Sequence, residues 1–107
     1  DWSSDVCSSD LNLVAIHLHE KYGEDLFYYH DNVEVDFCLF EHQCAFQVSY
    51  SIKDAATRER ELGVLNAYQK RYPGSKLFVI TMDEEETIEL DDLKIEVIPV
   101  WKWLLTF

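Results

Sequence analysis

The pattern of hydrophobic and polar positions in the first half of the chain predicts one helix and three short strands. Residues 12–22 carry apolar side chains at helical spacing, and Gly23 suits the position after a helix end. Residues 26–30 and 44–50 are short apolar runs, and residues 33–40 alternate with a period of two. The two faces of that alternating strand carry Val35, Phe37 and Leu39, and Glu34, Asp36 and Cys38. We predict that these three strands form a meander.

The second half predicts a long helix, a buried strand and a β-hairpin. A helix capped by Ser51 or Asp54 runs to about residue 72, where Pro73-Gly74 ends it. Its apolar stripe repeats in steps of three and four and consists of Leu62, Leu65, Tyr68 and Tyr72. Residues 76–82 are a nearly continuous apolar run, typical of a central strand covered on both faces.

Two further strand patterns follow this run. Residues 87–90 and 93–100 indicate a hairpin, in which Pro99 places the second arm at an edge or near its end. Residues 101–105 indicate a docking turn or short helix. The order is therefore α-β-β-β-α-β followed by a hairpin, and the helix between the third and fourth strands requires a crossover, which favours a mixed sheet.

Composition is that of one globular domain, with 107 residues of which 48% are hydrophobic. The formal charge of −12 repels nucleic acid at long range. Basic residues nevertheless gather in residues 53–76 and acidic ones in residues 83–96. This pattern indicates two solvated faces, with Arg58 and Arg60 in surface ion pairs, or one face that tolerates a phosphate backbone or an acidic partner.

Membrane and redox signals both favour the cytoplasm. No run of about 18 apolar residues occurs, so we expect no membrane partner. A disulfide framework requires denser cysteine in a secreted chain. The cysteines are therefore expected to be reduced thiols, at Cys7, Cys38 and Cys44.

Residues 1–11 differ from the rest of the chain. The string DWSSDVCSSDL has neither helical nor strand periodicity, and it back-translates to the sequence of a common short-read library adapter. We therefore expect residues 1–11 to be a non-native, disordered segment that is not part of the fold. Residues 12–107 are then the native domain.

The order of elements is the core topology of the PD-(D/E)xK nucleases. In those enzymes one strand presents an acidic residue, and the next presents Glu-x-Lys on the same face. The carboxylates hold Mg²⁺ and the lysine orients the attacking water. We therefore predict an α/β fold with a restriction-endonuclease-like α-β-β-β-α-β core, a mixed central sheet and a C-terminal β-hairpin.

The residues in register with that nuclease site are degenerate. Asp36 matches the acidic position, whereas Gln47 stands where the glutamate would be and Ser49 where the lysine would be. A neutral amide is a poor substitute for a carboxylate on Mg²⁺, and a serine cannot supply a cation. We therefore assign no catalytic residue and no metal ligand, and a residual metal site would rest on Asp36 and a displaced acid such as Glu34.

The chain from residue 12 to residue 107 resembles a known family throughout. The strings NLVAIHLHEKYG, VEVDF, FQVSYSI, KLFVIT and IPVWKWLL look like the C-terminal domain of unknown function in bacterial AAA-type ATP-binding proteins. This resemblance implies a missing N-terminal ATPase domain that holds ATP and Mg²⁺. No G-x-x-x-x-G-K-[ST] loop occurs in this chain, so the chain itself is expected to bind no cofactor.

Three functions follow as hypotheses. The first is a non-catalytic accessory domain that binds a substrate or partner for its own N-terminal ATPase domain. The second is a residual Mg²⁺-dependent DNA nuclease. The third is a protein-interaction module that regulates the ATPase without touching nucleic acid. In each case the parent protein is expected to be an ATPase.

Two smaller features complete the sequence reading. Three residues of the kinds that bind zinc lie close together in the sequence, but no fourth ligand follows: Cys38, His42 and Cys44. Residues 98–105 are dense in apolar side chains, so we expect this tail to lie in the core with Trp101 and Trp103 as its anchors.

Overall fold

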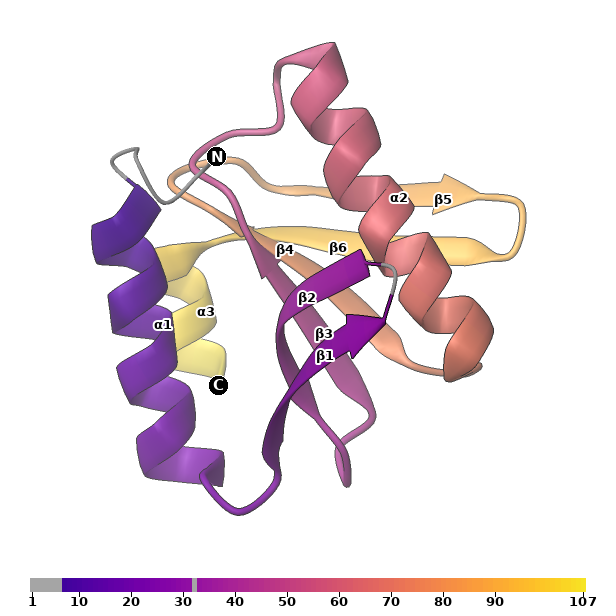
Figure 1. Cartoon of the computed structure of the whole chain (residues 1–107). Helices are drawn as coiled ribbons and strands as arrows, with labels where there is room; N and C mark the ends of the chain where they lie inside the picture. The colour runs from indigo at the N-terminus through magenta and orange to yellow at the C-terminus, as the bar shows by residue number, and fades with distance from the viewer. Residues whose placement is uncertain (1–6, 32) are drawn as a thin grey trace.

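The protein has an α/β fold in which helices cover both faces of one mixed sheet (Figure 1). The computed structural model describes residues 7–31 and 33–107, with side chains from residue 12 onward. The elements in chain order are α1 (Cys7–Tyr22), β1 (Leu26–Asp31), β2 (Val33–Leu39), β3 (Cys44–Val48), α2 (Ala55–Arg71), β4 (Lys76–Thr81), β5 (Glu86–Leu90), β6 (Leu93–Pro99) and α3 (Val100–Thr106).

The six strands lie in the order β1-β2-β3-β4-β6-β5. β1, β2 and β3 pair antiparallel as a meander, α2 crosses over to β4 parallel to β3, and β6 lies parallel to β4. β5 pairs antiparallel with β6 as a hairpin at the edge. The predicted α-β-β-β-α-β core, mixed sheet and C-terminal hairpin are therefore confirmed. Pro99 is the last residue of β6, so it lies near the strand end and not at a sheet edge.

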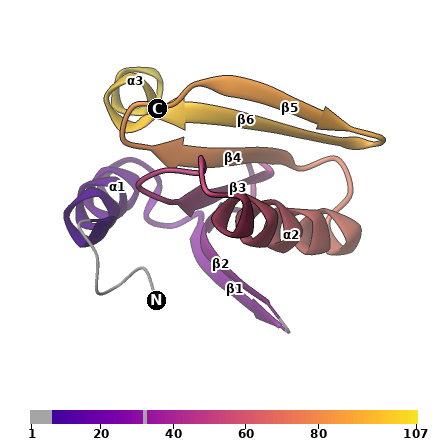
Figure 2. The same cartoon turned by 90° about the horizontal axis from the view of Figure 1, so that it is seen from above.

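Two hydrophobic clusters lie on opposite faces of the sheet. One includes Leu65 and Tyr68 of α2, and the other includes Leu18 of α1 and Trp103 of α3. Figure 2 shows α1 and α3 together on one side of the strands and α2 across from them. β4 lies between β3 and β6 with side chains in both clusters, as its continuous apolar run predicted.

The predicted alternation of β2 is wrong over part of its length. Val35 packs in the cluster beneath α2, whereas Phe37 and Leu39 pack in the opposite cluster. The β1–β2 register shifts between Phe27 and Tyr29, which places one extra residue in β2. Such a bulge reverses the faces of all residues beyond it.

The sequence signals at both ends of α2 are confirmed. Asp54 is the N-cap, and its carboxylate accepts a hydrogen bond of 3.0 Å from the Thr57 N–H. The turn after the helix uses Gly74 at a φ of 88°, a left-handed conformation that glycine adopts without steric cost. These caps fix both ends of the helix that carries one of the site residues below.

The C-terminal tail packs on the core through Val100 and Trp103, whereas Trp101 and Leu105 are exposed. Trp103 is fully buried and its ring packs on Phe46 and Phe107, with centroids 5.7 Å from each. Trp101 is 59% exposed, so the prediction that it anchors the tail is wrong. The reason is helical geometry, because residues two apart point about 200° apart around α3.

α1 begins at Cys7 rather than at Asn12. The expectation of disorder is therefore wrong for residues 7–11, because an existing helix adds residues at its end without repeating the cost of nucleation. Residues 1–6 lie outside the described residues. Among the helices of the described part, none is long and apolar enough to cross a membrane.

Candidate functional site: a buried polar network of Asp36, Gln47 and Glu61

Asp36 and Gln47 meet where β2 separates from β3. The β2–β3 pairing ends at Phe37 opposite Phe46, beside the bulge in β2. Beyond this point, hydrogen bonds between side chains and backbone N–H groups connect the two strands in place of backbone pairing. The Asp36 N–H donates to Gln47 Oε1 at 2.7 Å, and the Val48 N–H donates to Asp36 Oδ2 at 2.8 Å. The predicted acidic position and the predicted glutamate position are therefore in direct contact.

Glu61 of α2 completes this network. Gln47 Nε2 donates to Glu61 Oε1 at 2.7 Å, and Arg60 approaches the other carboxylate oxygen at 3.5 Å. The orientation of the Gln47 amide is fixed by chemistry, because only its oxygen can accept from an N–H and only its nitrogen can donate to a carboxylate. Both ends of the amide are thus occupied by protein partners. Gln47 and Glu61 are 5% and 4% exposed.

Glu61 is not among the predicted site residues, although the sequence held a signal for it. Glu61 lies four residues before Leu65 and seven before Tyr68, so it occupies the buried stripe of α2. A glutamate on an apolar stripe needs a buried partner, and Gln47 is that partner.

Burial changes the acidity of both carboxyls. Desolvation raises the pKa of Asp36 to about 7, the hydrogen bond from Val48 opposes this rise, and the charges of Glu61 and Glu34 add to it. Desolvation also raises the pKa of Glu61, against the hydrogen bond from Gln47 and the charge of Arg60. The network therefore holds negative charge at a cost, and it is more favourable when a proton is bound.

Asp36→Asn tests this electrostatic cost. The folded-state pKa is raised, so the carboxyl favours folding fully below the unfolded value of 3.8, and this contribution is lost as pH rises towards about 7. A shift of that size corresponds to at most roughly 4 kcal/mol. We expect Asp36→Asn to be more stable than the parent chain at pH 8 and to lose that advantage at pH 4 in urea unfolding. The exposed Asp83→Asn is the matched control, and equal behaviour of the two variants would contradict the account.

Ser49 and Glu34 do not join the network. β3 ends at Val48, and the Ser49 hydroxyl donates to the Ser51 carbonyl oxygen at 2.9 Å. The Ser49 N–H still donates to the Ile80 carbonyl oxygen at 2.9 Å, so the backbone pairing with β4 reaches this residue, but its hydroxyl is bonded to Ser51 and not to Gln47. Glu34 is exposed and contributes to the site only through its charge. The acid that is hydrogen-bonded to Gln47 is Glu61.

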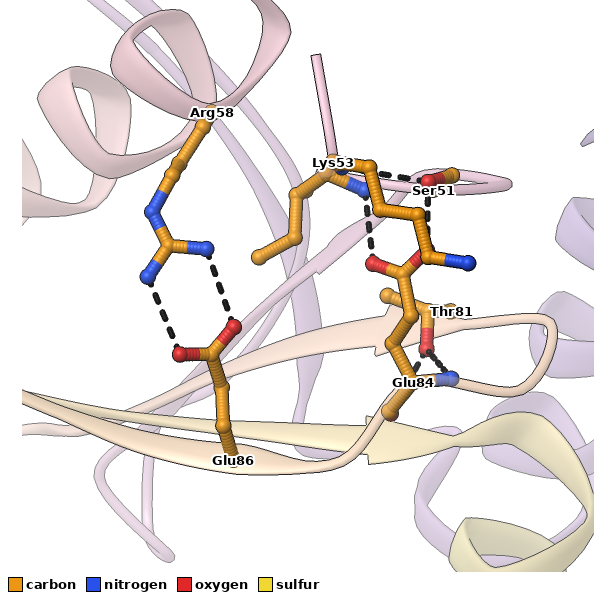
Figure 3. Close-up of polar contacts among 7 residues, drawn as sticks. Ser51, Lys53, Arg58, Thr81, Glu84 and Glu86 are labelled. Atoms are coloured by element: carbon orange, nitrogen blue, oxygen red, sulfur yellow. Dashed lines mark hydrogen bonds and ion pairs between the residues drawn. The ribbon is translucent and has the colours of Figure 1, made fainter. Parts of the chain in front are cut away.

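A second group of polar contacts positions the start of α2 (Figure 3). The Glu84 carboxylate accepts hydrogen bonds from the Ser51 hydroxyl and, at 2.9 Å, from the Ile52 N–H. Arg58 binds Glu86 through two hydrogen bonds of 2.9 and 3.0 Å. These contacts tie the β3–α2 connection and the first turns of α2 to the β4–β5 segment. They fix the helix that carries Glu61, and the predicted surface ion pair of Arg58 with the acidic hairpin is confirmed.

The three candidate zinc ligands do not converge on one site. Cys38 lies in the cluster under α2, Cys44 lies in the opposite cluster, and the His42 ring binds Asp25 at 3.0 Å. Burial raises the pKa of Cys38 to about 12 and also raises that of Cys44, so both are protonated thiols. Within residues 7–31 and 33–107, no three His, Cys, Asp or Glu side chains converge in a way that could hold a metal ion.

The chemistry of the donor set is unfavourable for Mg²⁺. Two carboxylates, those of Asp36 and Glu61, flank the Gln47 amide, but the oxygen of that amide already accepts from the Asp36 N–H. Mg²⁺ demands near-octahedral oxygen ligands and gives up water reluctantly. Asp36 Oδ2 already accepts from the Val48 N–H and Glu61 Oε1 from Gln47 Nε2, so one oxygen of each carboxylate is used within the protein. The geometry favours a structural role for these three side chains.

Comparison with known proteins gives one relative. No family model matches the chain, and no solved structure matches it. The chain is 37% identical over 110 residues to the uncharacterized protein MJ1544 of Methanocaldococcus jannaschii. The alignment covers 90% of this chain and 24% of that protein, so the chain spans about a quarter of the length of its relative.

Proposed function

We propose that residues 12–107 form a non-catalytic accessory domain of an AAA-type ATP-binding protein, which binds a partner or substrate for an ATPase domain outside this chain. The resemblance of the VEVDF, FQVSYSI and IPVWKWLL strings to the C-terminal domain of such proteins supports the association with an ATPase. The similarity to a relative about four times as long supports a place within a larger polypeptide.

One observation carries the non-catalytic assignment. Gln47 uses both ends of its amide within the protein, one on the Asp36 N–H and one on the Glu61 carboxylate. A nuclease of this topology needs free carboxylate oxygens and a cation beside them. Here the amide joins the Asp36 backbone N–H to the Glu61 carboxylate, and the Ser49 hydroxyl donates to the Ser51 carbonyl oxygen.

DNA cleavage tests this assignment. We expect the 107-residue chain to leave supercoiled plasmid and single-stranded oligonucleotides intact in millimolar Mg²⁺ or Mn²⁺, because Gln47 and Ser49 lack the charges that the reaction requires. Asp36→Ala is the control for contaminating nucleases. Metal-dependent cutting that disappears in Asp36→Ala and in Glu61→Gln would overturn the non-catalytic assignment.

A metal-dependent nuclease is the second candidate, and Glu61 is the observation that favours it. The charge of Glu61 raises the pKa of Asp36, and Arg60 supplies a guanidinium 3.5 Å from Glu61. Those three groups would have to replace the roles of the Glu-x-Lys strand. The cleavage assay above separates this candidate from the first.

A protein-interaction module that regulates the ATPase without contacting nucleic acid is the third candidate. The Arg58–Glu86 ion pair favours this candidate, because its two hydrogen bonds occupy one of the cations that a phosphate backbone would need. Affinity for a labelled duplex, measured over a range of salt, separates this third candidate from an accessory domain that binds DNA. A steep loss of affinity with salt indicates phosphate contacts.

A further inference from the structure

A groove of about 910 Å³ lies at the end of the molecule formed by the last turn of α1, the start of β1 and the β2–β3 turn. Figure 1 shows the end of α1 and the β2–β3 turn on the same, lower side of the fold. Tyr72, just after α2, also lines the groove. The lining shares no residue with the network of Asp36, Gln47 and Glu61. This surface is therefore independent of the candidate nuclease position.

Aromatic rings form one part of the groove lining. The Phe27 ring contacts Phe40 at a centroid distance of 6.4 Å and Tyr72 at 6.5 Å, both edge to face. Phe40 is 68% exposed at the beginning of the β2–β3 turn. Apart from its edge contact with Phe27, most of the Phe40 side chain is in water, and exposed apolar surface beside polar groups marks interaction sites. Such rings also attract cations over their faces.

Carboxylates form the other part of the lining. They belong to Glu20, Glu24, Asp25 and Glu41. The lysine of the lining, Lys21, donates to the Phe107 carbonyl oxygen. Asp25 is held by the Glu41 N–H at 2.6 Å and by His42 Nδ1 at 3.0 Å. Although desolvation opposes them, these hydrogen bonds lower the pKa of Asp25 below its usual value, so its carboxylate stays charged.

We propose that this groove binds a basic peptide segment of a protein partner, with an arginine or lysine between the aromatic rings and the carboxylates. Carboxylates satisfy the donors of a guanidinium or ammonium group, and the rings cover its face and the apolar stem behind it. Nucleic acid does not fit, because its phosphates would face the four acids. The inference rests on the proposed partner-binding function and adds to it the surface and the chemistry of the partner.

Fluorescence anisotropy with a labelled peptide of two arginines separated by a leucine tests the proposal on the 107-residue chain. We expect binding that weakens with salt, and that is lost when citrulline replaces arginine, because citrulline keeps the shape and removes the charge. Phe40→Ala and Glu24→Lys should each weaken binding by about tenfold, which corresponds to one desolvated cation contact. The matched controls are Leu90→Ala and Glu89→Lys on β5, where both residues are exposed and lie outside the groove.

Several outcomes would overturn the proposal. Equal loss of affinity in Glu24→Lys and Glu89→Lys would mean that the peptide follows the net negative charge and not the groove. Absence of binding, or equal binding of the citrulline peptide, would exclude cation recognition. Self-association of the chain that is abolished by Phe40→Ala would make a second copy the occupant. None of these results depends on DNA cleavage, so failure here is distinguishable from failure of the non-catalytic assignment.

Discussion

Trp103→Ala should lower the free energy of unfolding by about 3–5 kcal/mol, as expected for removal of a fully buried aromatic side chain. Trp103 lies between α1 and the sheet, where its ring meets His17, Phe46 and Phe107. Its loss leaves a cavity that three elements share, because the surrounding rings cannot collapse onto one another without shifting. Urea unfolding followed by circular dichroism measures the change.

Trp101→Ala is the control for this prediction. It removes the same side chain from the same helix, two residues away, at a position that is 59% exposed. We expect a change below about 1 kcal/mol. A domain of this size has about 5–15 kcal/mol of net stability, so Trp103→Phe, with a smaller cavity, keeps the test valid if the alanine variant does not fold. Equal destabilisation by the two alanine variants would contradict the described packing of α3.

Gln47→Glu should destabilise the protein by about 2–4 kcal/mol at pH 8, the cost of an additional buried and unpaired charge. The substitution restores the carboxylate of the Glu-x-Lys pattern but turns the 2.7 Å bond between Gln47 and Glu61 into a contact between two carboxylates. Asp36 adds a third acid to the same site. The loss should shrink at pH 5, because one of the carboxyls then binds a proton and can donate. Urea midpoints at the two pH values give the result.

Exchange of the amide and the carboxylate between positions 47 and 61 is the decisive control for Gln47→Glu. In the double variant Gln47→Glu with Glu61→Gln, one amide again faces one carboxylate across α2 and β3. We expect this variant to recover at least half of the lost stability, and the double-mutant cycle isolates the pairwise interaction. If Gln47→Glu is neutral at pH 8, or if the exchange brings no recovery, the hydrogen bond is not what holds these side chains together.

The sequence predicted the fold well where local signals were strong. Asp54 and Pro73-Gly74 located the ends of α2 because capping and turn chemistry act over a few residues. The continuous apolar run of β4 identified a central strand because both of its faces are buried. The tail of residues 98–105 was placed in the core by the density of its apolar residues.

The candidate site was predicted only in part, because its geometry depends on two long-range features. The bulge in β2 arises from pairing with β1, and a period-two pattern cannot reveal an extra residue. Glu61 lies on α2, 14 residues after Gln47 in the chain, and only the fold brings these two side chains together. The contact between Asp36 and Gln47 agrees with their predicted register, since the β2–β3 meander is local, whereas the turn of the Ser49 hydroxyl to the Ser51 carbonyl oxygen has no sequence signal.

The central claim is that Asp36, Gln47 and Glu61 form a closed structural network and not a metal site. Thermal unfolding with millimolar Mn²⁺ and with EDTA tests it most directly, because a metal that binds the folded chain raises its stability by mass action. The account predicts that the unfolding midpoint of the parent chain is the same with Mn²⁺ as with EDTA. The midpoint of Asp36→Asn should likewise not differ between the two conditions. A midpoint that rises with Mn²⁺ in the parent chain and does not rise in Asp36→Asn would contradict it.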